Sequence, residues 1–127
     1  MDVTPLIRRG SQVIQSYASG VFKVSGDLYN HAILVDVDET TPWDIGDITD
    51  IADLSIQSFS SLIERNEHID VVLLGCGKTM TFIPPALRGE LKKSGLSVDV
   101  MDTGAACRTY NVLMAEGRRV VCALLTT

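Results

Sequence analysis

A continuous apolar run that ends in glycines, Val71–Leu74 followed by Gly75 and Gly77, most restricts how this chain can fold. A strand with one face in water alternates apolar and polar residues, whereas a strand covered on both faces stays apolar along its length. The run therefore predicts a buried strand, and the glycines predict an abrupt turn where it ends. Such a strand requires layers packed on both faces of its sheet.

In the segment before this strand, the spacing of apolar residues changes from a strand-like to a helix-like period. Residues 20–26 and 30–37 are typical of two strands of a hairpin that turns near Ser25, Gly26 and Asp27. Apolar residues then recur at three- and four-residue spacing over residues 47–63, which predicts an amphipathic helix. The first half of the chain is therefore expected to be β, β, α.

Helices and strands alternate after the buried strand. Pro84-Pro85 fits the first turn of a helix, Thr103 is a credible N-cap and Gly117 a helix stop. The expected elements are a helix over 84–94, a strand over 96–101, a helix over 103–116 and a strand over 118–125. The order β-β-α-β-α-β-α-β indicates an α/β fold in layers. A single domain over residues 1–127 is expected, with residues 1–16 as a loosely ordered N-terminal segment.

Charge and composition exclude several classes of protein. The net charge is −5, and the 11 Lys and Arg residues are scattered apart from short pairs such as Arg118-Arg119, so no nucleic-acid partner is expected. No run approaches the roughly 20 apolar residues of a membrane span, and the start lacks the apolar core of a secretory signal. The three cysteines do not form a disulfide or metal pattern, so a cytoplasmic location is expected.

The triplet Asp102-Thr103-Gly104 matches the motif that carries the catalytic carboxylate of aspartic proteases. Those enzymes bring two such carboxylates together, and this chain has one triplet. The residues that follow are helix-forming and end at Gly117, which a protease loop would not be. The triplet is therefore interpreted as a corner between a strand and a helix, and no catalytic residue is predicted.

The segment Gly75–Thr79 resembles a phosphate-binding loop but lacks its spacing. A Walker A loop needs a glycine at the place of Val72, and a dinucleotide loop needs one at the place of Met80. Two interpretations stay open, a tight turn after a buried strand and a small anion-binding nest near Lys78.

The cysteines have a structural and a chemical interpretation. Cys76 and Cys107 both follow strands, so the fold can bring them together for a thiol-based redox role. Neither histidine obviously lies beside them, and small buried side chains remain the simpler interpretation. No cluster of carboxylates and histidines indicates a metal site, and no cofactor is expected.

The third helix has two occupied sides. One stripe, which includes Tyr110 and Met114, is expected to face the sheet. The opposite side carries Arg108 and Asn111 among small residues, which is unlike a solvated face. Either a neighbouring element binds these two side chains, or the side forms a groove for a ligand or partner.

Ligands of open α/β sheets favour the crevice beyond the carboxyl ends of parallel strands. If Val71–Leu74 and Val98–Met101 are parallel neighbours, several polar and small residues meet at that edge. The candidate groove consists of Gly75, Cys76, Gly77, Lys78, Asp102, Thr103, Arg108 and Asn111.

Three segments, "FKVSGDLYNHAILV", "VVLLGCG" and "VMDTGAACRTYNVLMAEGRRVVCALL", resemble a known family. It comprises small uncharacterised α/β proteins of the methanobacterial hypothetical-protein type and includes the mitochondrial respiratory complex I assembly factor 3. The resemblance implies a three-layer α/β fold with a mixed central sheet and no established enzymatic activity. It also implies protein partners, with respiratory-complex subunits and assembly proteins as candidates.

The favoured hypothesis is therefore a non-enzymatic assembly or adaptor protein. The alternative is a small-molecule-binding protein or enzyme that uses the crevice at Gly75–Lys78 and Asp102–Arg108. Nothing in the sequence specifies an oligomeric state.

Overall fold

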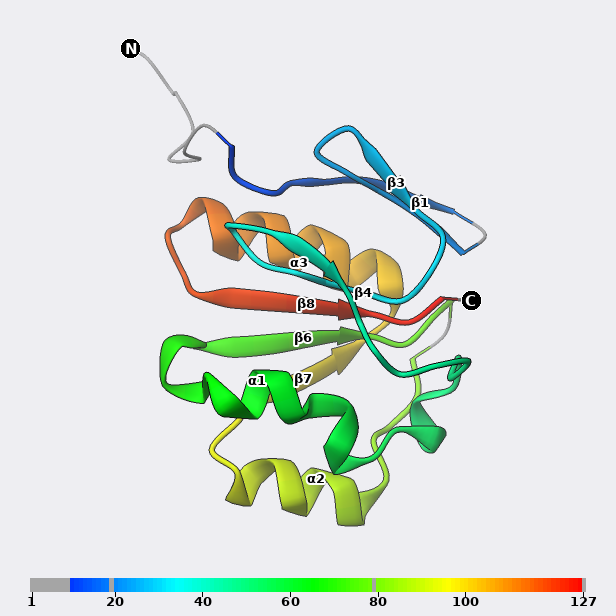
Figure 1. Ribbon diagram of the computed structural model, residues 1–127, viewed down its shortest axis with the longest axis vertical. Helices are drawn as coiled ribbons and strands as arrows, with labels where there is room; N and C mark the ends of the chain where they lie inside the picture. The colour runs from blue at the N-terminus through cyan, green and yellow to red at the C-terminus, as the bar shows by residue number, and fades with distance from the viewer. Residues whose placement is uncertain (1–9, 19, 79, 127) are drawn as a thin grey trace.

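The computed structural model describes residues 10–18, 20–78 and 80–126 of the chain. Figure 1 shows the elements stacked in layers, with a central sheet between helices and a smaller sheet over one of those helices. The three-layer α/β architecture that the family resemblance implies is confirmed.

The central sheet has five strands in the order β5-β4-β8-β6-β7. These strands are β4 (Ile33–Val35), β5 (Thr40–Pro42), β6 (Val71–Gly75), β7 (Val98–Met101) and β8 (Val120–Leu124). The strands β8, β6 and β7 run parallel, whereas β4 is antiparallel to both β5 and β8. The sheet is therefore mixed, and the expected parallel pairing of the runs at 71–74 and 98–101 is confirmed.

Both faces of β6 are buried, as its apolar run predicts. Val72 and Leu74 pack into a cluster with Phe59 on one face, while Leu73 packs into a second cluster with Tyr110 on the other. Full burial of one such side chain stabilises a fold by about 1.5–3 kcal/mol, so the two clusters hold the layers together. The helices α1 (Ser60–Glu64) and α2 (Pro85–Lys93) cover the first face, and α3 (Thr103–Ala115) covers the second.

The second sheet is an antiparallel meander of β1 (Ile14–Ala18), β2 (Val21–Val24) and β3 (Asp27–Tyr29). Ser25 and Gly26 link β2 to β3 with φ angles of 46° and 92°. Positive φ at both central residues fits a two-residue hairpin turn whose twist matches the strands. The predicted turn is confirmed at this position.

The partner strand predicted for this hairpin is wrong. Residues 27–29 pair with β2, whereas β4, inside the predicted segment 30–37, lies in the central sheet beside β8. All three residues of β4 are buried, which suits a strand covered on both faces better than half of an exposed hairpin. The strands β1 and β5 are also absent from the predicted order.

The predicted N-terminal segment and first helix need correction as well. Residues 1–9 lie outside the described part of the chain, but Ile14–Ala18 forms β1 rather than loosely ordered chain. The helix predicted over 47–63 is divided into 3₁₀ turns η1 (Ile51–Asp53) and η2 (Ile56–Phe59) followed by the short α1. The Ser58 hydroxyl accepts the backbone N–H of Ser55, the N-cap of η2, so a new turn begins there after η1.

Candidate functional site

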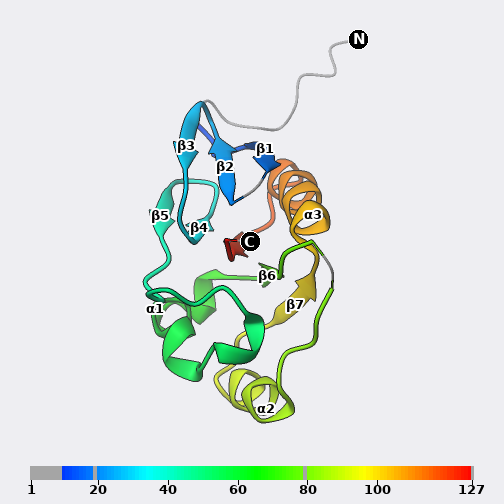
Figure 2. The same cartoon turned by 90° about the vertical axis from the view of Figure 1, so that its right-hand side faces the viewer.

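A pocket of about 270 Å³ lies at the predicted edge of the central sheet. Gly77 and Lys78 reach it from the loop after β6, and Asp102 and Thr103 from the start of α3. Tyr17 lines it from the end of β1. Figure 2 shows this side of the molecule, where α3 begins beside β1 and β2. Four of the eight predicted groove residues therefore line one pocket.

The corner between β7 and α3 is fixed by reciprocal hydrogen bonds. The backbone N–H of Thr103 donates to the carbonyl of Gly77 at 2.9 Å, and the N–H of Gly77 donates to the Thr103 hydroxyl at 3.0 Å. Gly77 has a φ of 106°, a conformation that glycine adopts readily. These two hydrogen bonds join the loop after β6 to the first residue of α3 at the pocket.

Asp102, rather than Thr103, is the N-cap of α3. Its carboxylate accepts the backbone N–H of Ala105 at 2.8 Å. This corrects the predicted cap, because Thr103 is the first helical residue and its hydroxyl serves Gly77 instead. A helix follows the triplet directly, so the interpretation as a strand-to-helix corner is confirmed.

Gly75 and Cys76 belong to the packing beneath the pocket. A Cβ at Gly75 would lie 2.7 Å from a methyl group of Leu124 and 3.3 Å from the Cα of Thr103. Only glycine lets α3 approach the sheet this closely. The Cys76 sulfur is half-buried and accepts the backbone N–H of Thr81 at 3.3 Å.

Asn111 binds a neighbouring element rather than the pocket. Its amide accepts the N–H of Ile14 at 3.0 Å and donates to the carbonyl of Ile14 at 2.8 Å. Tyr110 donates to the Gln12 carbonyl at 2.8 Å, so α3 holds the segment leading into β1 at two points. The structural interpretation of Asn111 is therefore the one that the geometry supports. Arg108 is exposed and does not line the pocket.

Burial makes the thiols of α3 and β8 poor nucleophiles. Desolvation raises the pKa of Cys107 to about 12, and it also raises the pKa of the fully buried Cys122. Thiolate chemistry needs a pKa near or below neutrality. The redox hypothesis for Cys107 therefore has no support from its surroundings. Within the described ranges, no three His, Cys, Asp or Glu side chains are placed to hold a metal ion.

Large apolar side chains are exposed on the two loops that contribute residues to the pocket. Phe82 is 74% exposed and Met80 52% exposed on the loop between β6 and α2. Tyr17 and Val21, at 41% and 38%, flank the turn between β1 and β2.

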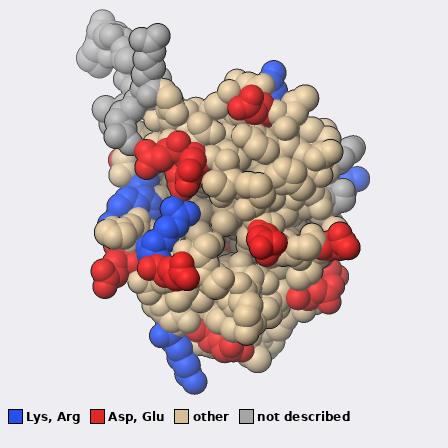
Figure 3. All heavy atoms as spheres, in the orientation of Figure 1, with Lys and Arg blue, Asp and Glu red and all other residues tan. Residues whose placement is uncertain are grey.

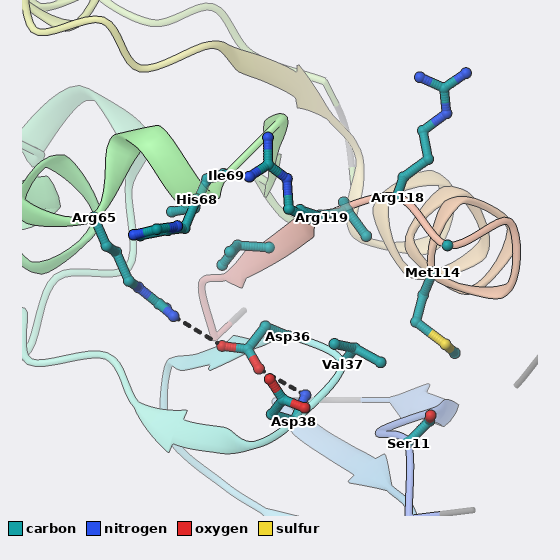
Figure 4. A pocket seen from close by; sticks show the side chains of 13 residues that line it. Ser11, Asp36, Val37, Asp38, Arg65, His68, Ile69, Met114, Arg118 and Arg119 are labelled. Atoms are coloured by element: carbon teal, nitrogen blue, oxygen red, sulfur yellow. Dashed lines mark hydrogen bonds and ion pairs between the residues drawn. The ribbon is translucent and has the colours of Figure 1, made fainter. Parts of the chain in front are cut away.

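A larger pocket, of about 500 Å³, lies at the opposite end of the central sheet and was not predicted. We call it the polar pocket; its charged lining residues are Asp36, Asp38, Arg65, His68, Arg118 and Arg119. Figure 4 shows Arg65 and His68 on one side and Asp36 and Asp38 across from them. The sequence carries one weak signal of this site, the pair Arg118-Arg119.

A family model described as "Protein of unknown function (DUF498/DUF598)" matches residues 14–125. The chain belongs to this family. An uncharacterized protein of Rhodobacter capsulatus is 33% identical over 91% of this chain and 86% of its own length. The NADH dehydrogenase [ubiquinone] 1 alpha subcomplex assembly factor 3 of Danio rerio is 33% identical over 89% of this chain. The alignment covers 63% of that relative, so the chain spans somewhat less than two thirds of its length.

Other similar proteins carry different descriptions. The 13 kDa major membrane protein of Francisella tularensis is 28% identical over 87% of this chain and 88% of its own length. The crystal structure of a Bordetella parapertussis protein superposes with a TM-score of 0.80 at 32% identity, covering 93% of this chain and 98% of that one. A Mth938-like domain of Bordetella pertussis superposes with a TM-score of 0.77 at 29% identity, covering 99% of this chain and 92% of that one.

These similarities confirm the family that the sequence resembles. The DUF498/DUF598 family includes proteins named as assembly factor 3, and the fold is that of Mth938-like domains. In the part of the chain that the structure describes, the helices are too short or too polar to cross a membrane.

Proposed function

We propose that this DUF498/DUF598 protein is a non-enzymatic assembly or adaptor factor that binds a protein partner. The observation that carries the proposal is the exposure of Met80 and Phe82 on the loop after β6, the same loop whose Gly77 and Lys78 line the pocket. Relatives named NADH dehydrogenase [ubiquinone] 1 alpha subcomplex assembly factor 3 support the same proposal. Subunits of a respiratory NADH dehydrogenase and their assembly proteins are the partner class that we propose.

The physical basis is the burial of apolar surface. Phe82 is 74% exposed, and covering such a side chain contributes about 1.5–3 kcal/mol to association. Aromatic and methionine side chains are enriched in the buried centres of protein interfaces. The adjacent pocket, with Lys78 at its rim, would accept one further side chain of the partner.

The test compares two exposed apolar residues at different places. Phe82→Ser is expected to weaken binding of purified NADH dehydrogenase subunits at least about tenfold, as loss of an interface anchor does. Leu28→Ser is the matched control, because Leu28 is 70% exposed but lies on β3. Biolayer interferometry with each subunit and each assembly protein measures the affinities. Equal effects of both substitutions, or binding of none of these proteins, would reject the proposal.

A small-molecule site in the same crevice is the second candidate function. The pocket favours it, because Lys78 adds a cation to the lining, and the one carboxylate there, Asp102, is engaged as the N-cap of α3. NMR titration with a set of small anions is expected to shift the amides of Gly77 and Gly104, and Lys78→Gln is expected to remove that response. If the amide shifts persist in Lys78→Gln, the anion does not bind as proposed.

We also propose that the protein functions in the cytoplasm. The number and spacing of its three cysteines match no disulfide framework, which suits a reducing compartment. Fractionation of cells of the source organism, with antibody detection, tests this. Recovery of the protein in the membrane fraction after a high-salt wash would contradict it.

A further inference from the structure

The polar pocket is built from segments that are far apart in the sequence. It lies where β6 and β8 begin and β4 ends, so it occupies the amino end of the parallel strands. Asp36 and Asp38 come from the turn between β4 and β5. Arg65 comes from the end of α1, and His68 from the 3₁₀ turn η3 (Asn66–His68). Its volume of about 500 Å³ is in the range of small-molecule sites.

One wall of the pocket provides hydrogen-bond donors. The guanidinium of Arg65 makes an ion pair with Asp36 at 3.1 Å, which uses one edge of a group with five N–H donors. The exposed imidazole of His68 lies beside it in Figure 4. In the same view Arg118 points away, and Arg119 is bound by Asp70 and the Glu67 carbonyl. Arg65 and His68 are therefore the groups that an incoming anion would meet.

The facing wall provides acceptors held in place by the backbone. One oxygen of Asp36 accepts the N–H groups of Asp38 and Glu39, at 2.8 Å and 3.0 Å, and the other accepts Arg65. The Asp36 carboxylate is thus oriented before any ligand arrives. Asp38 places a second carboxylate next to it (Figure 4).

Another part of the lining is apolar. Val37, Ile69 and Met114 contribute aliphatic and thioether surface. The local charge also differs from that of the whole chain. Three of the 11 Lys and Arg residues line this pocket, in a protein with a net charge of −5. Figure 3 shows basic side chains gathered at the left edge of the molecule, between acidic ones.

We propose that the polar pocket binds a small organic acid that carries a hydroxyl or ammonium group next to its carboxylate and a short branched apolar chain. The carboxylate binds Arg65 and His68, the donor group binds the acidic wall, and the apolar chain lies on Val37, Ile69 and Met114. Hydroxy acids and amino acids share this chemistry. The proposal is independent of the assembly function, because the pocket is at the other end of the sheet from Phe82.

Four probes with one apolar body test the chemistry. They are L-leucine, 2-hydroxy-4-methylpentanoate, 4-methylpentanoate, which lacks the donor, and 3-methylbutylamine, which lacks the carboxylate. NMR titration of the ¹⁵N-labelled full chain is expected to shift the amides of Val37, His68 and Ile69 with one or both of the first two. The probe without the donor group and the probe without the carboxylate are each expected to bind about tenfold or more weakly, as loss of a charge-assisted hydrogen bond implies. Stronger binding of leucine than of the hydroxy acid would identify amino acids as the ligand class, and the reverse order would identify hydroxy acids.

Variants separate recognition from folding. His68→Gln replaces an exposed side chain. It is expected to weaken binding of the tightest probe without changing the NMR spectrum outside the polar pocket. Arg65→Lys keeps the charge but removes the planar fork, and it is expected to weaken the probe further. Lys93→Gln, on the exposed side of α2, is the control and should bind normally. Equal affinity for all four probes, shifts outside the pocket, unchanged binding by His68→Gln, or no binding at about 10 mM would each overturn the proposal.

Discussion

The two ends of the central sheet are built in different ways. At the carboxyl end, the pocket is shaped by main chain and glycine, with Gly77 and Thr103 exchanging hydrogen bonds beneath it. At the amino end, the polar pocket is lined by long charged side chains such as Arg65. Main-chain junctions tolerate little change, whereas exposed side chains can be replaced without disturbing the fold. Substitutions should therefore cost most stability at the carboxyl end.

The largest effect is expected from Gly75→Val. Its new side chain would meet Leu124, Ala106 and the Thr103 backbone, all within 3.3 Å of the first added carbon. Overpacking of this kind should lower the free energy of unfolding by about 2–3 kcal/mol. Urea denaturation followed by circular dichroism measures the change. Wild-type stability of this variant would show that α3 does not pack as closely as described.

Asn111→Ala should have the next largest effect. It removes both hydrogen bonds to Ile14, which should cost about 1–2 kcal/mol and speed hydrogen exchange along β1. Arg108→Ala, on the exposed side of the same helix, is the comparison and should stay within about 0.5 kcal/mol of the wild type. If Arg108→Ala lost as much unfolding free energy as Asn111→Ala, the stabilising contact would not be specific to Asn111.

A moderate effect is expected from the Cys107 thiol at alkaline pH. Burial raises its pKa from 9.0 to about 12, so its contribution to stability is complete below pH 9 and is lost as the pH rises toward 12. Cys107→Ala should therefore reduce the loss of unfolding free energy between pH 8 and pH 10 by about 1 kcal/mol. Denaturation curves at the two pH values measure it. Burial also raises the pKa values of Cys122 and Tyr110, which act in the same direction. An equal loss in the wild type and in Cys107→Ala would contradict the prediction.

The smallest effect is expected at the amino end, from Asp70→Asn. Asp70 and Arg119 form an exposed ion pair at 2.9 Å, and the hydrogen bond from Arg119 lowers the pKa of Asp70. That contribution is present above the ordinary pKa of an aspartate and is lost as the pH falls. The variant should therefore be marginally less stable at neutral pH and indistinguishable from the wild type at low pH or high salt. A large loss at high salt would contradict the contrast between the two ends.

The parts of the fold that the sequence predicts are those with a strong local pattern. The apolar run of β6 indicates a strand covered on both faces, and its parallel pairing with β7 follows from the alternation of helices and strands. β1 escapes prediction because only Ile14 of its five residues is buried, so it has no alternation to recognise. The helix expected over 47–63 has the right apolar spacing, but serine and aspartate side chains bind the backbone and divide it.

The same distinction applies to the sites. The crevice at Gly77 and Asp102 follows from a general rule about the carboxyl ends of parallel strands, so the sequence suffices to place it. The polar pocket joins Asp36 to Arg65, which are 29 residues apart, and to Arg119, much farther along the chain. Only tertiary structure brings such side chains together, and no spacing in the sequence reports it.

The pairing between Asn111 and Ile14 also limits how this protein associates with others. β1 is an edge of the smaller sheet, and an edge strand with free N–H and carbonyl groups invites another chain to add to it. The Asn111 amide takes both groups of Ile14, as a neighbouring strand would. Uncontrolled growth of the sheet is therefore blocked at that position by a single side chain.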